Sequence, residues 1–286
     1  MGKSVIFKGK MMLEDQAHVD IEDRGYQFGD GVYEMIRVYN GKMFSAEEHL
    51  QRLVSSTEKI HIDLVYSINE MHDMLQELIV KNQLLLGTVY VQVTRGTAPR
   101  SHAFPGKNVS PVFTAYTKEV ERPLATMGNG VKALTVEDIR WLMCDVKSLN
   151  LLGNVLAKQK AVEQGCYEAI QHRAQEVTEG SSSNIYIVQS GKIITHPANN
   201  LILNGIVRQV ILCLAKKNGL IVEERPFSLS EIVDADEVFL TSTTSEITPI
   251  VEVDGRVIAD GKPGKMTKQI QRLYLEEIIH QCGLID

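Results

Sequence analysis

The sequence predicts an α+β protein made of two domains. Strand-like and helix-like segments follow one another without the regular alternation that a doubly wound parallel sheet requires. Several neighbouring strand-like segments are joined by turns of two residues, which only antiparallel strands allow. The chain has 286 residues, more than a single domain usually contains. Length and pattern together favour two α+β domains over one Rossmann-like sheet.

Two helices in the first half of the chain have recognisable start signals. Ser45-Ala46-Glu47-Glu48 and Ser67-Ile68-Asn69-Glu70 both match the capping box, in which Ser and Glu satisfy free N–H groups of the first turn. After the second box, apolar residues recur at the spacing of one helix face: Met71, Met74, Leu75, Leu78 and Ile79. Strands are expected at residues 88–94 and 111–117.

A segment with proline and glycine at residues 122–130 is predicted as the linker between two domains. It would separate a smaller α+β domain of residues 1–121 from a larger, cofactor-binding domain of residues 131–286. The expected elements of the larger domain are a strand at 131–136, helices at 148–164 and 205–218, hairpins turning at Ser190-Gly191 and Asp254-Gly255, and a last helix with Met266, Ile270, Leu273, Tyr274 and Ile278 on one face.

Composition is that of a soluble globular protein and excludes several classes. Apolar residues make up 44% and charged residues 23% of the chain, which is too apolar for a disordered protein. The net charge of −6 argues against nucleic-acid binding, which needs a basic surface. No apolar run approaches the roughly 20 residues of a membrane-spanning helix. The cysteines form no CxxC pair and are expected to be reduced thiols; they are Cys144, Cys166, Cys213 and Cys282.

Motifs for nucleotide, metal or hydrolase chemistry do not occur in the sequence. It contains neither G-x-G-x-x-G nor the P-loop pattern, so phosphate cradles of those types are not expected. The histidines are scattered and no H-E-x-x-H occurs, so we expect no metal site. No G-x-S-x-G nucleophile elbow is present either.

Lys147 follows an apolar stretch and precedes the predicted helix at residues 148–164. There its ammonium would lie beside the positive end of the helix dipole, which favours the neutral amine that a Schiff-base lysine requires. The alternative is a surface lysine extending from a strand end, and this segment alone favours that alternative. Three further signals are each weak alone. Glu179, in a loop of small hydroxyl residues, would suit a pyridine nitrogen. Gly205 at a helix start would suit an anion, and Thr243 adds a hydroxyl at a strand end.

Four segments of the chain form a more specific set. They are residues 23–34 (DRGYQFGDGVYE), 144–152 (CDVKSLNLL), 178–184 (TEGSSSN) and 241–246 (TSTTSE). Together they resemble the signature segments of the fold-type IV pyridoxal-phosphate enzymes, and most closely those of the bacterial D-amino acid aminotransferases. The resemblance extends from about Val19 to the last helix and implies the two-domain α+β architecture of that class.

The resemblance implies a role for each residue of a pyridoxal 5'-phosphate site. Lys147 would form the Schiff base and carry the substrate proton, and Glu179 would bind the pyridine nitrogen. The remaining contacts would come from Arg52, Ile206, Val207 and Thr243 at the phosphate, Leu203 at the ring and Ser182 in the adjacent loop. Members of the family usually carry Thr where this chain has Val207. We therefore expect looser cofactor retention, by about 1 kcal/mol for one hydrogen bond.

Substrate handedness would depend on Tyr33, Arg100 and His102. In the family, R-x-H at this place and a tyrosine bind the substrate α-carboxylate, and the resemblance implies that the loop comes from the partner subunit. A guanidinium suits this role because its planar fork pairs with both carboxylate oxygens. On the sequence alone, Arg100 and His102 would be solvated loop residues.

The activity implied is ping-pong transamination of D-amino acids, typically D-alanine and 2-oxoglutarate to pyruvate and D-glutamate. Branched-chain L-aminotransferases and aminodeoxychorismate lyases of the same fold are the alternatives, and the R-x-H sequence favours the D-specific reaction. A non-catalytic ligand-binding relative is disfavoured because the chain has both Lys147 and Glu179. The resemblance further implies a homodimer that acts on small molecules. Composition and charge predict a cytoplasmic protein that binds neither nucleic acid nor membrane.

Overall fold

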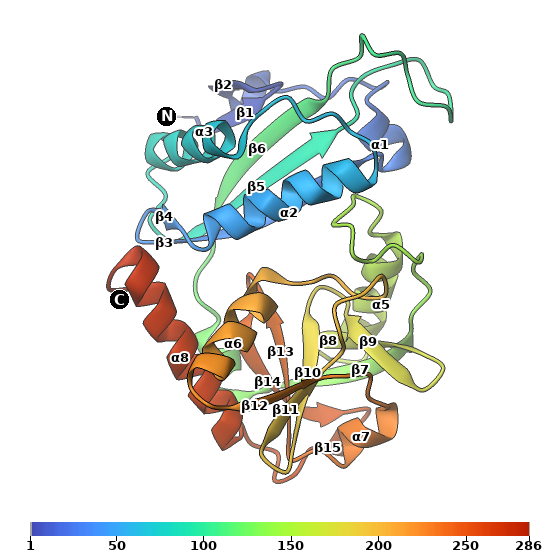
Figure 1. Cartoon of the computed structure of the whole chain (residues 1–286). Helices are drawn as coiled ribbons and strands as arrows, with labels where there is room; N and C mark the ends of the chain where they lie inside the picture. The colour runs from blue at the N-terminus through green and yellow to red at the C-terminus, as the bar shows by residue number, and fades with distance from the viewer. Residues whose placement is uncertain (1, 286) are drawn as a thin grey trace. The chain divides into compact units, whose positions relative to one another are not determined.

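The computed structural model describes residues 2–285, which divide into two compact units (Figure 1). The first unit contains the chain up to Glu121, the segment Val146–Asn150 and the chain from Ile278 on. The second contains Arg122–Asp145 and Leu151–Glu277. The short segment that carries Lys147 thus belongs to the first unit, although the sequence on both sides of it belongs to the second.

The first unit is built on one antiparallel sheet with the strand order β2-β1-β6-β5-β3-β4. Its strands are β1 (Ser4–Phe7), β2 (Lys10–Leu13), β3 (Gly31–Tyr39), β4 (Lys42–Met43), β5 (Gly87–Thr94) and β6 (Val112–Glu119). Alternate residues of β3, namely Val32, Ile36 and Val38, lie in the apolar core. Because side chains alternate along a strand, Tyr33 lies on the opposite face of the sheet.

Helices α2 (Ala46–Lys59) and α3 (Ile68–Lys81) pack on the sheet of the first unit and on each other (Figure 1). The capping box predicted for α3 is confirmed: Ser67 N donates to Glu70 Oε2 at 2.8 Å, and Glu70 N donates to Ser67 Oγ at 3.3 Å. The box predicted for α2 is wrong. Ser45 has a left-handed backbone with φ 51°, so its side chain does not cap the helix. Two short helices, η1 (Glu14–Gln16) and α1 (Arg24–Phe28), complete the unit.

The second unit is built on a mixed sheet with the strand order β12-β11-β10-β13-β14-β7-β8-β9, and β15 pairs with β14. Its strands are β7 (Val131–Glu137), β8 (Glu168–Arg173), β9 (Glu176–Gly180), β10 (Asn184–Gln189), β11 (Lys192–Thr195), β12 (Ile221–Glu224), β13 (Glu237–Ser242), β14 (Glu246–Val253) and β15 (Arg256–Val257). The hairpins predicted at Ser190-Gly191 and Asp254-Gly255 are confirmed. A turn of only three residues joins β9 to β10, although other strands separate them in the sheet order, so the sheet must curve.

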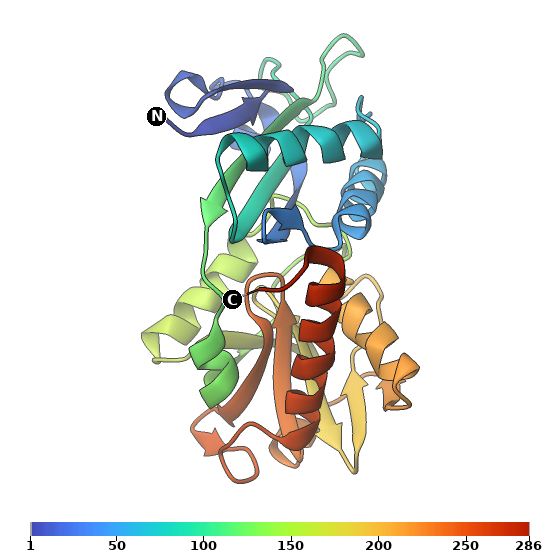
Figure 2. The same cartoon turned by 90° about the vertical axis from the view of Figure 1, so that its left-hand side faces the viewer.

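Helices of the second unit differ from the prediction at two places. The expected linker at 122–130 contains a helix, α4 (Leu124–Asn129), which packs against β14 through Met127 and its neighbours. The helix expected from residue 148 is α5 (Leu152–Glu163) and begins later, because residues 148 and 149 are paired with the β3 edge. The other helices are α6 (Ile206–Lys217), α7 (Leu229–Val233) and α8 (Lys265–Cys282), the last shown along its length in Figure 2.

The expected division into residues 1–121 and 131–286 therefore needs correction in detail. The first unit includes Val146–Asn150 and the chain from Ile278 on, which the prediction placed in the larger domain. The reason is hydrogen bonding and packing, because Val146 lies in the apolar core of the first unit. No helix among residues 2–285 is long and apolar enough to cross a membrane.

Candidate functional site

The segment that carries Lys147 is held to strand β3 by backbone hydrogen bonds. Tyr33 N donates to Lys147 O at 3.0 Å, and Leu149 N donates to Gly31 O at 3.0 Å. The Nζ atom of Lys147 lies 4.2 Å from the centre of the Tyr33 ring, where the negative face of the ring attracts a cation. The half-buried amine is thus placed on the Tyr33 face of the sheet. The predicted effect of a following helix dipole is wrong, since α5 starts only at Leu152.

Arg52 on α2 is anchored by a buried carboxylate on β3. Its Nε and Nη2 atoms donate to Glu34 Oε1 and Oε2 at 2.6 and 2.9 Å, and His49 Nδ1 lies 2.7 Å from Glu34 Oε2. Burial opposes ionisation of Glu34, but the charge of Arg52 and the hydrogen bonds from Arg52 and His49 outweigh it and hold the pKa of that carboxyl well below its usual value. The helix also approaches the lysine segment, because Lys147 N donates to Ser56 Oγ at 3.4 Å.

The predicted substrate residues fall into two groups within the first unit. Arg100 and His102 are exposed and lie around Phe28, with the Arg100 guanidinium 4.3 Å from the ring centre and the His102 ring centre 5.6 Å from it. Tyr33 instead stacks on Tyr90 at 5.6 Å. The structure thus brings Arg100 and His102 together and places Tyr33 with Lys147.

The loop that carries Arg100 and His102 is fixed at its base by a buried ion-pair cluster. Arg24 and Arg95 both donate to Asp30, each through Nε at 2.8 Å, and Arg24 Nη1 donates to Ser101 O at 2.6 Å. Burial opposes ionisation, but these hydrogen bonds and charges lower the pKa of Asp30. The loop is therefore anchored at Ser101 while the two predicted binding side chains beside it remain exposed.

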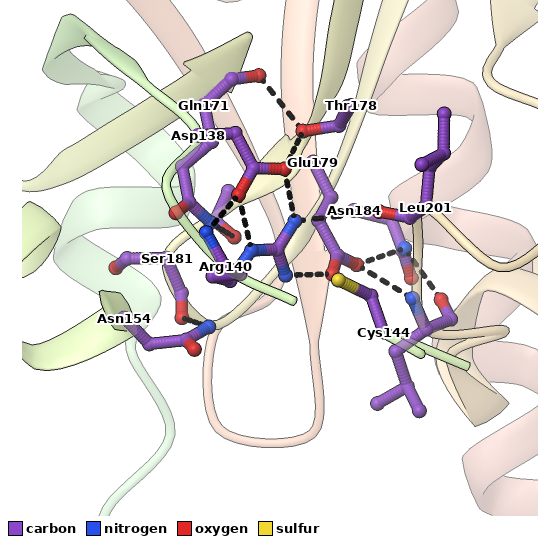
Figure 3. Close-up of polar contacts among 12 residues, drawn as sticks. Asp138, Arg140, Cys144, Asn154, Gln171, Thr178, Glu179, Ser181, Asn184 and Leu201 are labelled. Carbon is purple, nitrogen blue, oxygen red and sulfur yellow. Dashed lines mark hydrogen bonds and ion pairs between the residues drawn. The ribbon is translucent and has the colours of Figure 1, made fainter. Parts of the chain in front are cut away.

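In the second unit, Glu179 at the end of β9 is nearly fully buried and accepts hydrogen bonds on both oxygens (Figure 3). Its Oε1 accepts from Arg140 Nη1, and its Oε2 accepts from Leu203 N at 3.0 Å and Asn184 Nδ2 at 3.2 Å. Burial raises the pKa of Glu179 and outweighs the opposing charge of Arg140. Of the predicted residues, Glu179 and Leu203 are therefore in direct contact.

Sequence reasoning missed the residues that surround Glu179. The loop after β7 holds the buried side chains of Arg140 and Asp138, and Asn184 follows the serine turn. No motif marks Asp138-Ile139-Arg140 as part of a site, and only the fold places it beside Glu179. The neighbouring short segment 144–152 was the nearest signal in the sequence.

The serine turn after Glu179 has divided roles. Ser181 and Ser183 both donate through Oγ to the buried Glu168, and the Ser183 bond is 2.8 Å long. These two hydrogen bonds fix the turn. Ser182 lies between them and is exposed. The predicted loop residue is thus the one hydroxyl of the three that does not bind Glu168 in the described chain.

Helix α6 presents an uncapped N-terminus at the predicted phosphate position. Gly205 is its N-cap residue, no side chain caps it, and its first turn contains no acidic residue. A Cβ atom at Gly205 would lie 2.3 Å from Asn184 Oδ1, so a side chain there would collide with Asn184. The free N–H groups of Ile206 and Val207 and the helix dipole favour an anion at this end. Thr243 is half-buried in the turn that follows β13, the strand on which α6 packs.

The part of the chain that the structure describes contains neither a metal-binding cluster nor a disulfide bond. Residues 2–285 contain no cluster of three or more His, Cys, Asp or Glu side chains suited to a metal ion. All four cysteines are free thiols, as the sequence predicts.

Comparison with known proteins identifies the family. Residues 31–253 match the family model of the class IV amino-transferases. A D-alanine aminotransferase of Listeria monocytogenes serotype 1/2a (strain 10403S) is 50% identical over 284 residues, covering 99% of this chain and 98% of the relative. The branched-chain amino acid aminotransferase of Escherichia coli superposes with a TM-score of 0.92 at 27% identity, covering 96% and 94% of the two chains. The branched-chain amino acid aminotransferase of Thermobaculum terrenum in its holo PLP form superposes with a TM-score of 0.87 at 26% identity. The match covers 98% of this chain and 95% of that one.

The chain therefore belongs to the class IV aminotransferases, and within that class to the D-alanine aminotransferase family. The predicted α+β, fold-type IV architecture is confirmed, and so is the prediction that the protein is an enzyme that transfers amino groups. The roles of single residues stay predictions.

Proposed function

We propose that the protein is a pyridoxal-phosphate-dependent aminotransferase that exchanges amino groups between D-amino acids and 2-oxo acids. D-Alanine and 2-oxoglutarate would give pyruvate and D-glutamate in a ping-pong reaction. The observation that carries the proposal is the buried carboxylate of Glu179 near an uncapped helix N-terminus, which suits a ligand with a basic ring nitrogen and a phosphate. The Listeria relative, a D-alanine aminotransferase that is 50% identical over 99% of this chain, supports the substrate class.

The residues present fit pyridoxal phosphate in charge. Glu179 would hold the ring nitrogen, and the N–H groups of Ile206 and Val207 at the uncapped start of α6 would hold the phosphate. Thr243 and Arg52 are the further proposed phosphate ligands, and Leu203 the proposed ring contact. When bound, the cofactor supplies an electron sink for charge that develops at the substrate Cα. A relative solved in its PLP form has the same fold.

Lys147 is the proposed proton carrier of the reaction. Its backbone is fixed on β3, and Nζ lies on the Tyr33 ring, so the amine has a defined position at the sheet face. Lys147 would hold the cofactor through Nζ, and the same amine would accept the proton of the substrate Cα. Precise placement of a single amine favours transfer on one face of the substrate.

Arg100, His102 and Tyr33 are the proposed carboxylate-binding residues that select the D-enantiomer. The exposed Arg100 and His102 would bind the substrate of the partner subunit in a homodimer. Exposed apolar side chains in the second unit, among them Leu142, Leu152 and Val155, support the proposed association of two copies. The free thiols are consistent with the reducing conditions of the cytoplasm, which is the proposed location.

The decisive assay is pyruvate release from D-alanine with 2-oxoglutarate as acceptor, against L-alanine and L-leucine as donors. We expect turnover of D-alanine and little turnover of either L-amino acid. The purified protein should be yellow, and Lys147→Ala should lose the visible absorption band while still binding the cofactor. A preference for L-leucine would overturn the D-specific proposal and favour the activity named for the branched-chain relatives.

A further inference from the structure

Asp138 is a buried carboxylate that the proposed reaction does not use directly. We propose that Asp138 is a positioning residue, which through Arg140 sets the strength with which Glu179 holds a proton at the cofactor ring nitrogen. The inference rests on the proposed role of Glu179 and adds to it a second carboxylate that touches neither substrate nor cofactor.

Asp138 fixes the Arg140 guanidinium in one orientation (Figure 3). Its Oδ1 accepts from Arg140 Nε at 2.8 Å, and its Oδ2 accepts from Arg140 Nη2 at 2.8 Å. Arg140 N also donates to Asp138 Oδ1 at 3.1 Å. A two-point pairing of this type holds a guanidinium in plane. The remaining nitrogen, Nη1, is then directed to Glu179 Oε1.

Asp138 also changes the charge that Glu179 experiences. A single guanidinium in direct contact would strongly favour the ionised carboxylate and oppose a positively charged ring nitrogen beside it. With Asp138 bound to its other edge, Arg140 belongs to a pair of almost zero net charge. The pKa of Glu179 is in fact raised, since burial outweighs the partly compensated charge of Arg140. Glu179 therefore remains an effective partner for the ring proton.

The other groups around Glu179 add no competing charge. Burial raises the pKa of the Cys144 thiol to about 11, so it is neutral, and its Sγ donates to Trp141 O. Asn184 Nδ2 and Leu203 N are neutral donors. Behind Asp138, Arg173 on β8 donates from Nε to Asp138 Oδ2 at 3.1 Å, and its side chain is partly exposed. Arg173 therefore offsets part of the negative charge by which Asp138 compensates Arg140.

Asp138 has a positional role as well, which the test must separate from the electrostatic one. Thr178, directly before Glu179 on β9, donates from Oγ1 to Asp138 Oδ2 at 3.0 Å. Loss of Asp138 could shift the strand and disturb Glu179 without any effect of charge. A measurement of activity alone would not distinguish these causes, whereas the pH at which the ring nitrogen loses its proton does.

The experiment uses the holoenzyme reconstituted with pyridoxal phosphate carrying nitrogen-15 in the ring. The nitrogen chemical shift reports ring protonation and is followed as a function of pH. Asp138→Asn should leave the charge of Arg140 uncompensated and lower the deprotonation midpoint by about 1 or more on the pH scale. Arg173→Gln should raise the midpoint, because Asp138 then compensates Arg140 alone. The opposite signs cannot both arise from a displaced strand.

The matched control is Asp254→Asn, which removes the same charge from the same unit. Asp254 lies in an exposed turn, where it accepts from Thr135 N and Oγ1. We expect its midpoint to equal that of the unmodified enzyme. Equal midpoints for Asp138→Asn and the control would overturn the inference. If Asp138→Asn does not fold, Arg173→Gln decides by itself, and an unchanged or lowered midpoint overturns the inference.

Glu179→Gln separates this inference from the proposed function. If it leaves the midpoint unchanged, Glu179 does not bind the ring nitrogen and the proposed cofactor site is wrong. If Glu179→Gln changes the midpoint but Asp138→Asn does not, the cofactor site stands and the role of Asp138 is rejected.

Discussion

Two buried glutamates, Glu34 and Glu179, respond in opposite ways to nearly the same burial. Their exposed fractions are 0% and 5%, yet the pKa of Glu34 is lowered and that of Glu179 is raised. Glu34 pairs with Arg52 and lies beside His49, whereas the cation beside Glu179 is shared with a second carboxylate. At the residue scale, the charge of the neighbouring groups, and not the degree of burial, decides whether the carboxyl pKa is lowered or raised. Glu34 suits a fixed anchor for Arg52, and Glu179 suits a proton partner.

Val207 tests the proposed phosphate site at the same scale. It is buried at the second position of α6, where its N–H is free but its side chain offers no hydroxyl. Val207→Thr should tighten cofactor binding by about 1 kcal/mol, since one hydrogen bond to a charged group is added. The measurement is the cofactor dissociation constant. Val210→Thr, one turn further along α6, should leave it unchanged, and the same constant for Val207→Thr and the unmodified protein would contradict the expectation.

At the scale of elements, helices α2 and α3 show that one sequence pattern can begin a helix in two ways. Both start with Ser and Glu at capping-box spacing, but only Ser67 accepts a hydrogen bond from the first turn. Ser45 N is instead bound by Gln281 Oε1 at 2.9 Å, and its left-handed backbone directs the side chain elsewhere. A residue more than 200 positions away thus takes the acceptor role that the capping box would give to Glu48.

A pair of serine variants tests this difference. Ser67→Ala should lower the free energy of unfolding by about 1 kcal/mol, the usual effect of losing an N-cap. Ser45→Ala should have a smaller effect, because its Oγ is buried without a hydrogen-bond partner among the described residues. Denaturant unfolding of both variants measures the difference. Equal losses would show that Ser45 caps α2 in solution.

Gly205 gives a second prediction for an element, the start of α6. Gly205→Ala would place a Cβ 2.3 Å from Asn184 Oδ1, and Asn184 also binds Glu179 and Leu203. We expect weaker cofactor binding, by about tenfold, because the helix start must move away from the proposed phosphate position. Gly128→Ala in α4 meets nothing within 4 Å and is the control. Unchanged cofactor affinity in Gly205→Ala would argue against a phosphate at this helix end.

For the whole molecule, buried carboxylates in both units couple stability to pH. The pKa values of Asp30 and Glu34 are lowered in the first unit, and that of Asp138 is lowered to about 2 in the second. Each carboxyl is therefore bound more strongly when ionised. The stability that it contributes is fully present above its ordinary pKa of about 4 and is lost as the pH falls toward the lowered value.

Acid unfolding is the corresponding prediction. The melting temperature should fall steeply below about pH 4, as the native state resists protonation and the unfolded chain does not. Asp30→Asn should lower stability at neutral pH and reduce the further loss on acidification, because one of the linked groups is gone. Asp73→Asn, at a side chain that is 85% exposed, is the control and should follow the unmodified protein. An identical acid profile for Asp30→Asn would contradict the linkage.

The sequence by itself determined the features that depend on near neighbours. The hairpin turns at Ser190-Gly191 and Asp254-Gly255, the cap at Ser67 and the buried face of α3 follow from residues within a few positions of one another. Four short segments in a fixed order were enough to identify the family that the comparisons show. These signals are local, so no tertiary contact is needed to read them.

Tertiary structure decided the start of α5, the helix in the expected linker and the chemical state of the proposed site. The start of α5 is set by pairing of residues 148 and 149 with β3, and the state of Glu179 by Arg140, 39 positions away. Hydrogen bonds and charges act over ångströms in space, whatever the separation along the chain. Only the folded chain brings Asp138, Arg140 and Glu179 together in a buried, weakly solvated place where their charges interact strongly.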